Sequence, residues 1–184
     1  GDDTILGGTQ DDTIIGGDLG DLRKQWEEAE ANHKPSARAT LRAAGTEFFK
    51  ARVQAAESSG VGHNDAVAAL NAVVLTALGY EPKVETIDLK RNTTDLLQVP
   101  VAAKVETGTG LLLVALNAGQ ADTPDDLFAE ADPLEPSAAN LLESLWRDAE
   151  KKQVTAVGDA VGEIFSTDDP PRYVLVAAGA FLLL

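Results

Sequence analysis

Residues 111–117 read Leu-Leu-Leu-Val-Ala-Leu-Asn and decide the fold class of this 184-residue chain. A short run that is apolar on both faces is typical of a strand buried between two layers. The turn sequence Thr-Gly-Thr-Gly at 107–110 precedes it, and residues 98–106 (QVPVAAKVE) form another strand candidate before the turn. We therefore expect 98–106 and 111–117 to pair as a β-hairpin, although Pro100 is unfavourable in a central strand.

Further strands and several helices are expected on both sides of this hairpin. Residues 83–90 (KVETIDLK) alternate polar and apolar side chains, and residues 172–184 contain two short apolar stretches around a glycine. Helical spacing of apolar residues predicts helices at about 22–33, 37–57, 65–78, 138–150 and 154–165. The prediction is an α/β or α+β fold, with N-terminal helices packed on a four- to five-stranded mixed sheet. Two of the helices are placed between its third and fourth strands.

Helix boundaries and short spacings add details that a structure can test. Asn64 or Asp65 is the expected N-cap of the helix at 65–78, and Gly79 is expected to end it with a positive φ. Gly158 and Gly162 have helical spacing, which favours close helix packing at that face.

The first 21 residues differ from the rest because they repeat with a period of nine. GDDTILGGT at 1–9 is followed by QDDTIIGGD at 10–18, and LGD at 19–21 begins a third copy. The pattern resembles the calcium-binding nonapeptides of secreted toxins and proteases. Glycines permit tight turns, and carboxylates with backbone carbonyls suit a cation that takes about six to eight oxygens. The candidate calcium ligands are Asp3, Asp12 and Asp21.

The repeat also departs from that pattern, which leaves another interpretation open. Gln10 and Leu19 stand where glycine is expected, and few copies are present. Residues 1–17 could equally form a hairpin or a leader fused to the domain. We therefore divide the chain into a glycine/aspartate repeat at 1–21 and a helical plus mixed-sheet domain at 22–184. The apolar strand at its end predicts that this domain is cut at its C-terminal side.

Composition excludes several functional classes. Lys and Arg number 15 against 30 Asp and Glu, and the formal charge of −15 argues against a free-standing nucleic-acid binder. The absence of cysteine excludes disulfides and thiolate chemistry. Methionine is also absent, even at position 1, which predicts a fragment or a processed product. Hydrolase, zinc-protease and P-loop motifs are missing, as are an apolar run of membrane-spanning length and a signal-peptide pattern.

The remaining titratable residues favour structural roles. His33 and His63 lie at predicted helix boundaries without ligand-spaced partners, so we interpret them as surface or capping residues. Three pairs of neighbouring carboxylates lie in polar, proline-containing segments, where solvated charges are expected: Asp125-Asp126, Glu130 with Asp132, and Asp168-Asp169.

Six stretches carry a resemblance to a known family: DLGDLRKQWEEAEANHKPSARATLRAAGTEFFKAR (18–52), LTALGYEP (75–82), QVPVAAKV (98–105), GLLLVALNAG (110–119), ADPLE (131–135) and EIFSTDDPPRYVLVAAGAFLLL (163–184). Residues 18–184 resemble the N-terminal region of large bacterial adenine-specific DNA methyltransferases, the type IIG-like enzymes of restriction–modification and phage defence. The resemblance implies that the catalytic N-P-P-Y-type motif lies downstream of this fragment. It further implies a cytoplasmic protein with no membrane partner, which packs against its own downstream domains and meets DNA through them.

That region of the family is similar to a restriction-nuclease fold, whose active form holds magnesium with an acid near the second strand and Asp/Glu-x-Lys on the third. Here Asn117 stands about where the acid would be and Gly119 where the lysine would be. Lys104 and Glu106 on the second strand cannot supply the site alone. The resemblance therefore implies a degenerate, non-cleaving module that acts as a scaffold or regulator.

Two alternatives stay open. One is a calcium-binding structural domain of an exported repeat protein, which would be secreted. The other is a live magnesium nuclease whose acid has migrated to another position.

Overall fold

The computed structural model describes residues 23–25, 27–28, 31–32, 37–121, 123–127 and 140–184. The chain divides between Ala43 and Ala44 into two compact units. In the first unit the described residues before position 33 are helical, and Arg23 Nε donates to Glu27 Oε1 at 3.0 Å, one helical turn away. The second unit holds both sheets and is the subject of the paragraphs below.

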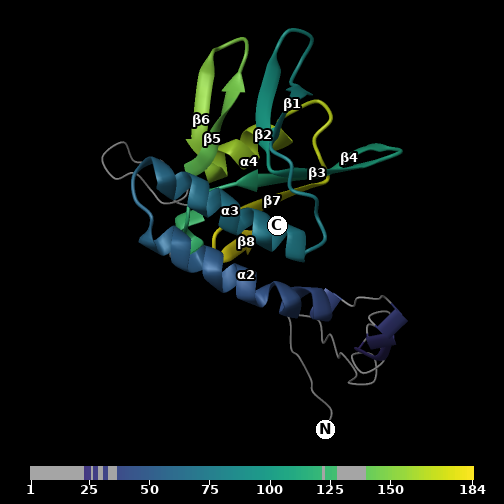
Figure 1. Cartoon of the computed structure of the whole chain (residues 1–184). Helices are drawn as coiled ribbons and strands as arrows, with labels where there is room; N and C mark the ends of the chain where they lie inside the picture. The colour runs from purple at the N-terminus through teal and green to yellow at the C-terminus, as the bar shows by residue number, and fades with distance from the viewer. Residues whose placement is uncertain (1–22, 26, 29–30, 33–36, 122, 128–139) are drawn as a thin grey trace, which may run out of the picture. The chain divides into compact units, whose positions relative to one another are not determined.

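Two long helices precede the sheets (Figure 1). Helix α2 (Ala37–Glu57) has the predicted bounds, whereas α3 (Val61–Ala77) begins earlier than predicted. Its N-cap is Gly60, at φ 62°, rather than Asn64 or Asp65, because the positive φ lets the chain reverse directly after α2. Gly79 has the expected positive φ of 90° after the helix.

The described residues contain eight strands, which form two four-stranded sheets. Sheet A is antiparallel, in the order β1-β2-β5-β6: β1 (Glu85–Lys90), β2 (Leu96–Val101), β5 (Asn140–Arg147) and β6 (Lys152–Ala156). Sheet B has the order β3-β4-β7-β8: β3 (Ala103–Thr107), β4 (Gly110–Asn117), β7 (Tyr173–Ala178) and β8 (Phe181–Leu183). Sheet B is mixed, because β4 and β7 are parallel while its other pairs are antiparallel.

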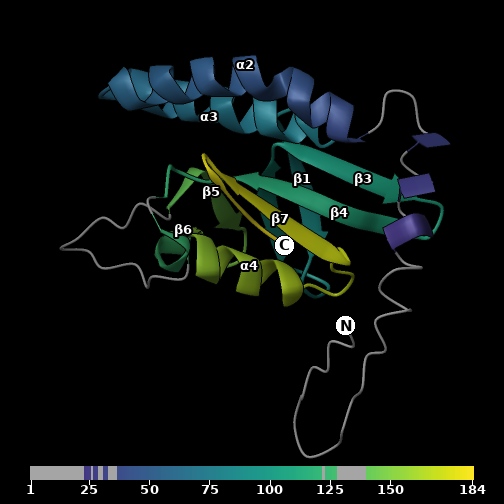
Figure 2. The ribbon, with the colours of Figure 1, turned by 90° about the horizontal axis from the view of Figure 1, so that it is seen from below.

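Strand β4 is buried on both faces, as its sequence predicted. Val114 and Leu116 point into a core shared with sheet A, whereas Leu113 and Ala115 pack with Leu75 of α3. Helix α4 (Val157–Phe165) connects β6 to β7, and Figure 2 shows α3 and α4 on opposite sides of β4 and β7. The mixed α/β architecture and the hairpin of β3 and β4 are therefore confirmed.

The prediction of helices between β4 and β7 was largely wrong. Residues 138–150 were expected to be helical, but the described part of that range forms β5. The range 154–165 begins as β6 and becomes α4 only at Val157. The buried side chains of Leu141 and Leu145 lie four positions apart, a spacing that fits one turn of a helix and the inner face of a strand equally.

The prediction of one sheet was also wrong, because residues 98–106 do not form a single strand. Ala102 separates β2 from β3, and the two halves belong to different sheets. Pro100 is tolerated in β2 because pairing with β5 covers only Leu97 and Gln98, so no β5 residue stands opposite the proline.

Three smaller findings complete the fold. A Cβ added at Gly158 or Gly162 would meet no atom within 4 Å, so the close helix packing expected there is absent in the described structure. The described helices include none that is long and apolar enough to cross a bilayer. Between β4 and β5, residues 124–127 form a short 3₁₀ helix, η1 (Pro124–Leu127).

Candidate functional site

The carboxyl end of β4 is the place where the family resemblance puts a metal-binding acid. Asn117 is the last residue of β4 and pairs in register with Ala177 of the parallel strand β7. Its side chain is half-buried, and its Oδ1 is fully buried without a hydrogen-bond partner among the described residues. The position thus carries a neutral amide in a largely apolar setting.

A small cavity lies next to this amide. Asn117 lines it together with Pro100 and Ala102 of the bent β2–β3 ribbon and Glu143 of β5, and its volume is about 10 Å³. Such a volume holds about one water molecule. Among the described residues, Glu143 is the only carboxylate that lines it, and no group of three or more His, Asp or Glu side chains is arranged to hold a metal ion.

Gly119, which stands where the nuclease lysine would be, has a backbone role. Its N–H donates to the carbonyl of Asn140 at 2.8 Å, and the adjacent Ala118 forms an isolated antiparallel bridge to Leu141. The end of β4 is therefore tied to the start of β5, which fixes sheet A against sheet B at this point.

Lys104 and Glu106 form a charge cluster on β3 rather than a catalytic couple. Lys104 Nζ lies 2.8 Å from Glu106 Oε1 and 3.2 Å from Glu85 Oε1. The bond to Glu106, followed by that to Glu85, raises the pKa of the Lys104 ammonium. Hydrogen bonds from Lys83 and then from Lys104 lower the pKa of Glu85. Lys104 pairs in register with Val114, so β4 carries an apolar residue opposite it.

A larger groove runs between β1, the β3–β4 hairpin and the segment after α4. Its volume is about 510 Å³, and Asp168 and Asp169 line it together with Asp88 of β1. All three side chains are exposed, which agrees with the expectation of solvated charges at 168–169. Asp126 instead accepts a hydrogen bond from Thr123 N at 2.8 Å and caps η1, whereas Glu130 and Asp132 lie outside the described residues.

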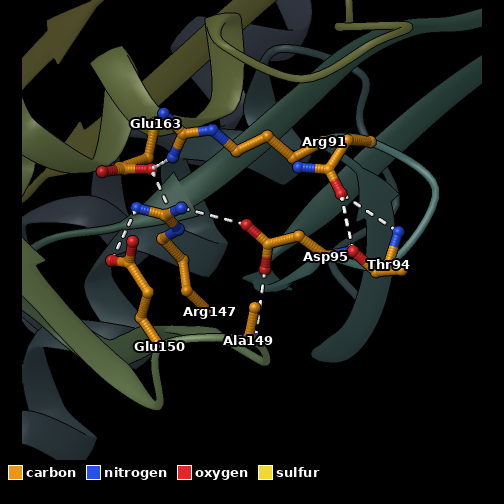
Figure 3. A network of polar contacts seen from close by, with 8 residues as sticks. Arg91, Thr94, Asp95, Arg147, Ala149, Glu150 and Glu163 are labelled. Atoms are coloured by element: carbon orange, nitrogen blue, oxygen red, sulfur yellow. Dashed lines mark hydrogen bonds and ion pairs between the residues drawn. The ribbon is translucent and has the colours of Figure 1, made fainter.

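A polar network that no sequence pattern indicated joins the β1–β2 turn, the β5–β6 hairpin and α4 (Figure 3). Arg147 Nη2 lies 2.9 Å from Asp95 Oδ2, and its Nη1 lies 3.0 Å from Glu150 Oε2. Glu163 of α4 pairs with Arg91, and its Oε2 is 3.8 Å from Arg147 Nε. The pairs Arg147–Asp95 and Arg91–Glu163 join residues that are 52 and 72 positions apart, so no local sequence pattern indicates them.

Within this network Asp95 is the most buried charge, at 4% exposed. The hydrogen bond from Arg147, followed by the one from the backbone N–H of Ala149 at 3.2 Å, lowers the pKa of its carboxyl group. The pKa of Arg147 is raised, chiefly by the same bond to Asp95. Every carboxylate of the network is paired with a guanidinium, so the arrangement is suited to stabilising the fold rather than to proton transfer.

The other predicted site residues do not converge on this region. His63 lies near the start of α3, where its Nδ1 is 3.2 Å from both Ser58 Oγ and the carbonyl of Ala55, a position that caps the end of α2. His33 and the calcium candidates Asp3, Asp12 and Asp21 lie outside the described residues. Comparisons with known protein families, curated proteins and solved structures find no match.

Proposed function

We propose that this chain is the non-catalytic N-terminal module of a DNA-modifying restriction or phage-defence methyltransferase, where it acts as a scaffold or regulator. The resemblance of residues 18–184 to that family supports the proposal. The order α3, β1, β2–β3, β4, α4 and β7, with β4 parallel to β7, is compatible with a nuclease-like ancestry.

The identity and surroundings of Asn117 are the observation that carries the proposal. A magnesium site needs anionic oxygen ligands, and the side chain at this position is a neutral amide whose buried oxygen has no partner in the described structure. The nearby Glu143 is a single carboxylate, and Gly119 uses its backbone to join the sheets. The sheet can therefore serve as a scaffold while its former site lacks an acid-and-lysine couple.

The charge of the chain favours an indirect role in DNA contact. A formal charge of −15 repels phosphates. We therefore assign DNA contact to domains downstream in the parent chain, with this module packing against them or gating them.

Reading the coding sequence beyond Leu184 tests the assignment to this class. The proposal expects an N-P-P-Y-type motif and a cofactor-binding motif downstream, and an open reading frame without them would refute it. A second experiment incubates the purified 184-residue chain with supercoiled plasmid and magnesium. We expect intact plasmid at micromolar protein, and metal-dependent nicking would favour the live-nuclease alternative instead.

The nine-residue repeat supports the second candidate, a calcium-binding structural domain of an exported protein. Aspartates recur in register at positions 3, 12 and 21 in this repeat. A calcium titration, described in the Discussion, tests this candidate independently of the first.

A further inference from the structure

Strand β1 has one free edge. It is the terminal strand of sheet A, and in the described structure β2 is the only strand that pairs with it. Arg91 N donates to the carbonyl of Asp95 across the β1–β2 turn at 3.0 Å. This bond shows that the backbone groups of Arg91 point toward β2. In an antiparallel pair every second residue points its N–H and C=O away from the partner.

That alternation identifies the outward backbone groups. Counting back from Arg91, residues Lys90, Asp88 and Thr86 direct their N–H and C=O groups away from β2. The carbonyl of Lys90 indeed accepts a hydrogen bond from Asp168 N at 2.7 Å, from outside the sheet. Among the described residues no partner binds the outward groups of Thr86 and Asp88, so these groups are available for another strand.

The groove of about 510 Å³ follows this edge. Four consecutive residues of β1, from Ile87 to Lys90, line it. Successive side chains of a strand point to opposite faces, so a groove lined by all four runs along the edge rather than over one face. Leu111 of β4 lines it as well, and the volume is within the range of about 300–1,000 Å³ that is usual for ligand sites.

The charge of the groove selects the chemistry of a partner. Four carboxylates and two lysines line it. Lys104 is already paired with Glu106 and Glu85. Within the described residues, by contrast, the carboxylates of Asp88, Asp168 and Asp169 have no hydrogen bond or ion pair. Three unpaired carboxylates thus outnumber the other lysine, Lys90, and a ligand that complements this groove is therefore basic.

We propose that the outer edge of β1 binds an extended basic peptide of another polypeptide as an added strand. The N–H and C=O groups of Thr86 and Asp88 bond to its backbone, and the carboxylates of Asp88, Asp168 and Asp169 bind its Lys or Arg side chains. Strand addition combines backbone bonds for affinity with side-chain contacts for specificity. The inference does not depend on the proposed methyltransferase context.

Fluorescence anisotropy with a labelled ten-residue peptide of alternating Lys and Val tests this proposal. We expect saturable binding that weakens as salt is added, and no binding of the matching Glu–Val peptide. Equal affinity for the two peptides would show that charge complementarity is absent and would overturn the proposal.

Substitutions at Asp88 separate the backbone contribution from the charge. Asp88→Pro removes one outward N–H without breaking a bond to β2, because proline is tolerated where the N–H faces solvent. We expect it to weaken binding at least tenfold, and Asp88→Asn, which keeps the N–H, to weaken it less. Asp159→Asn removes the same charge from an exposed position on α4 and serves as the control with unchanged affinity.

Two further measurements keep the test decisive. If Asp88→Pro fails to fold by circular dichroism, the double variant Asp168→Lys/Asp169→Lys replaces it and is expected to abolish binding of the Lys–Val peptide. Sedimentation of the wild type examines self-association. A dimer that Asp88→Pro or the double variant dissociates would identify a second copy as the occupant and overturn the proposal, as would a folded variant that binds the peptide normally.

Discussion

The side-chain oxygen of Asn71, in helix α3, accepts a hydrogen bond from the backbone N–H of Gly179 at 2.7 Å. The Nδ2 of the same side chain donates to the carbonyls of Ala118 at 3.1 Å and Ala177 at 3.0 Å. Asn71 is fully buried, at 0% exposed. One amide thus fastens α3 to the ends of the parallel strands β4 and β7, close to the position of Asn117.

Replacing Asn71 by Ala is expected to destabilise the protein by about 2–3 kcal/mol, because three backbone groups lose their buried partner. Urea unfolding monitored by circular dichroism measures the change. Asn64→Ala, at an exposed position of the same helix, is the matched control and should stay within about 0.5 kcal/mol of the wild type. A similar loss for both variants would contradict the role assigned to Asn71.

Gly179→Ala is expected to lower the free energy of unfolding by about 1–2 kcal/mol. Gly179 has a φ of 67°, a conformation that disfavours a Cβ, and an added Cβ would lie 3.3 Å from Gln120 Cγ. Gly162→Ala has the opposite expectation, a gain of about 0.5–1 kcal/mol, because a Cβ there meets open space within a helix. Thermal unfolding of both variants tests the pair, and a gain at position 179 would refute the packing described.

The free energy of unfolding should decrease as pH is lowered through the range where the Asp95 carboxyl group titrates. The pKa of its carboxyl group is lowered in the folded state, so the unfolded chain binds a proton first as pH falls. The contribution of Asp95 is therefore present above the ordinary Asp value of about 3.9 and is lost as pH falls through the lowered folded pKa. Urea midpoints between about pH 6 and pH 2.5 measure it.

Asp95→Asn is the comparison for this pH profile. It should lower stability at neutral pH, where the pairing with Arg147 is lost, and should approach the wild type at the acidic end. Asp159→Asn, at an exposed site, serves as the charge control. Parallel profiles for the wild type and Asp95→Asn would mean that the Asp95 carboxyl does not titrate with folding.

The second candidate function, a calcium-binding domain, predicts that the nonapeptide repeat binds calcium. Isothermal titration of the chain with CaCl₂ should show heat that disappears when Asp3, Asp12 and Asp21 are all replaced by Asn, because each substitution removes an anionic ligand. Chelation with EDTA should then lower the melting temperature of the wild type only. An identical, flat titration for both proteins would leave the repeat without this function.

The candidate site could be predicted only in part. Asn117 was found from the sequence because it ends an apolar run whose strand character is unambiguous. Glu143, which lines the same cavity, was not found, because its segment was expected to be helical. The groove along β1 was missed for a different reason. Asp88 and Asp168 lie far apart along the sequence, and only the backbone bond from Asp168 N to the carbonyl of Lys90 brings their segments together.

The sequence by itself determined those helices and strands whose local pattern of apolar residues fits only one type of secondary structure. Residues 111–116 form a short, uniformly apolar run that indicates a buried strand, and the helix at 37–57 and the two short strands at the C-terminus follow from similarly clear patterns. Only the tertiary structure decided that Leu141 and Leu145 face the core from a strand, and that the chain changes sheets at Ala102. The spacing of the leucines fits two periodicities, and burial against a partner selects between them. Asn71 likewise bonds to Ala177 and Gly179, which lie more than 100 positions away along the chain. Only the folded chain brings such a donor and acceptor together.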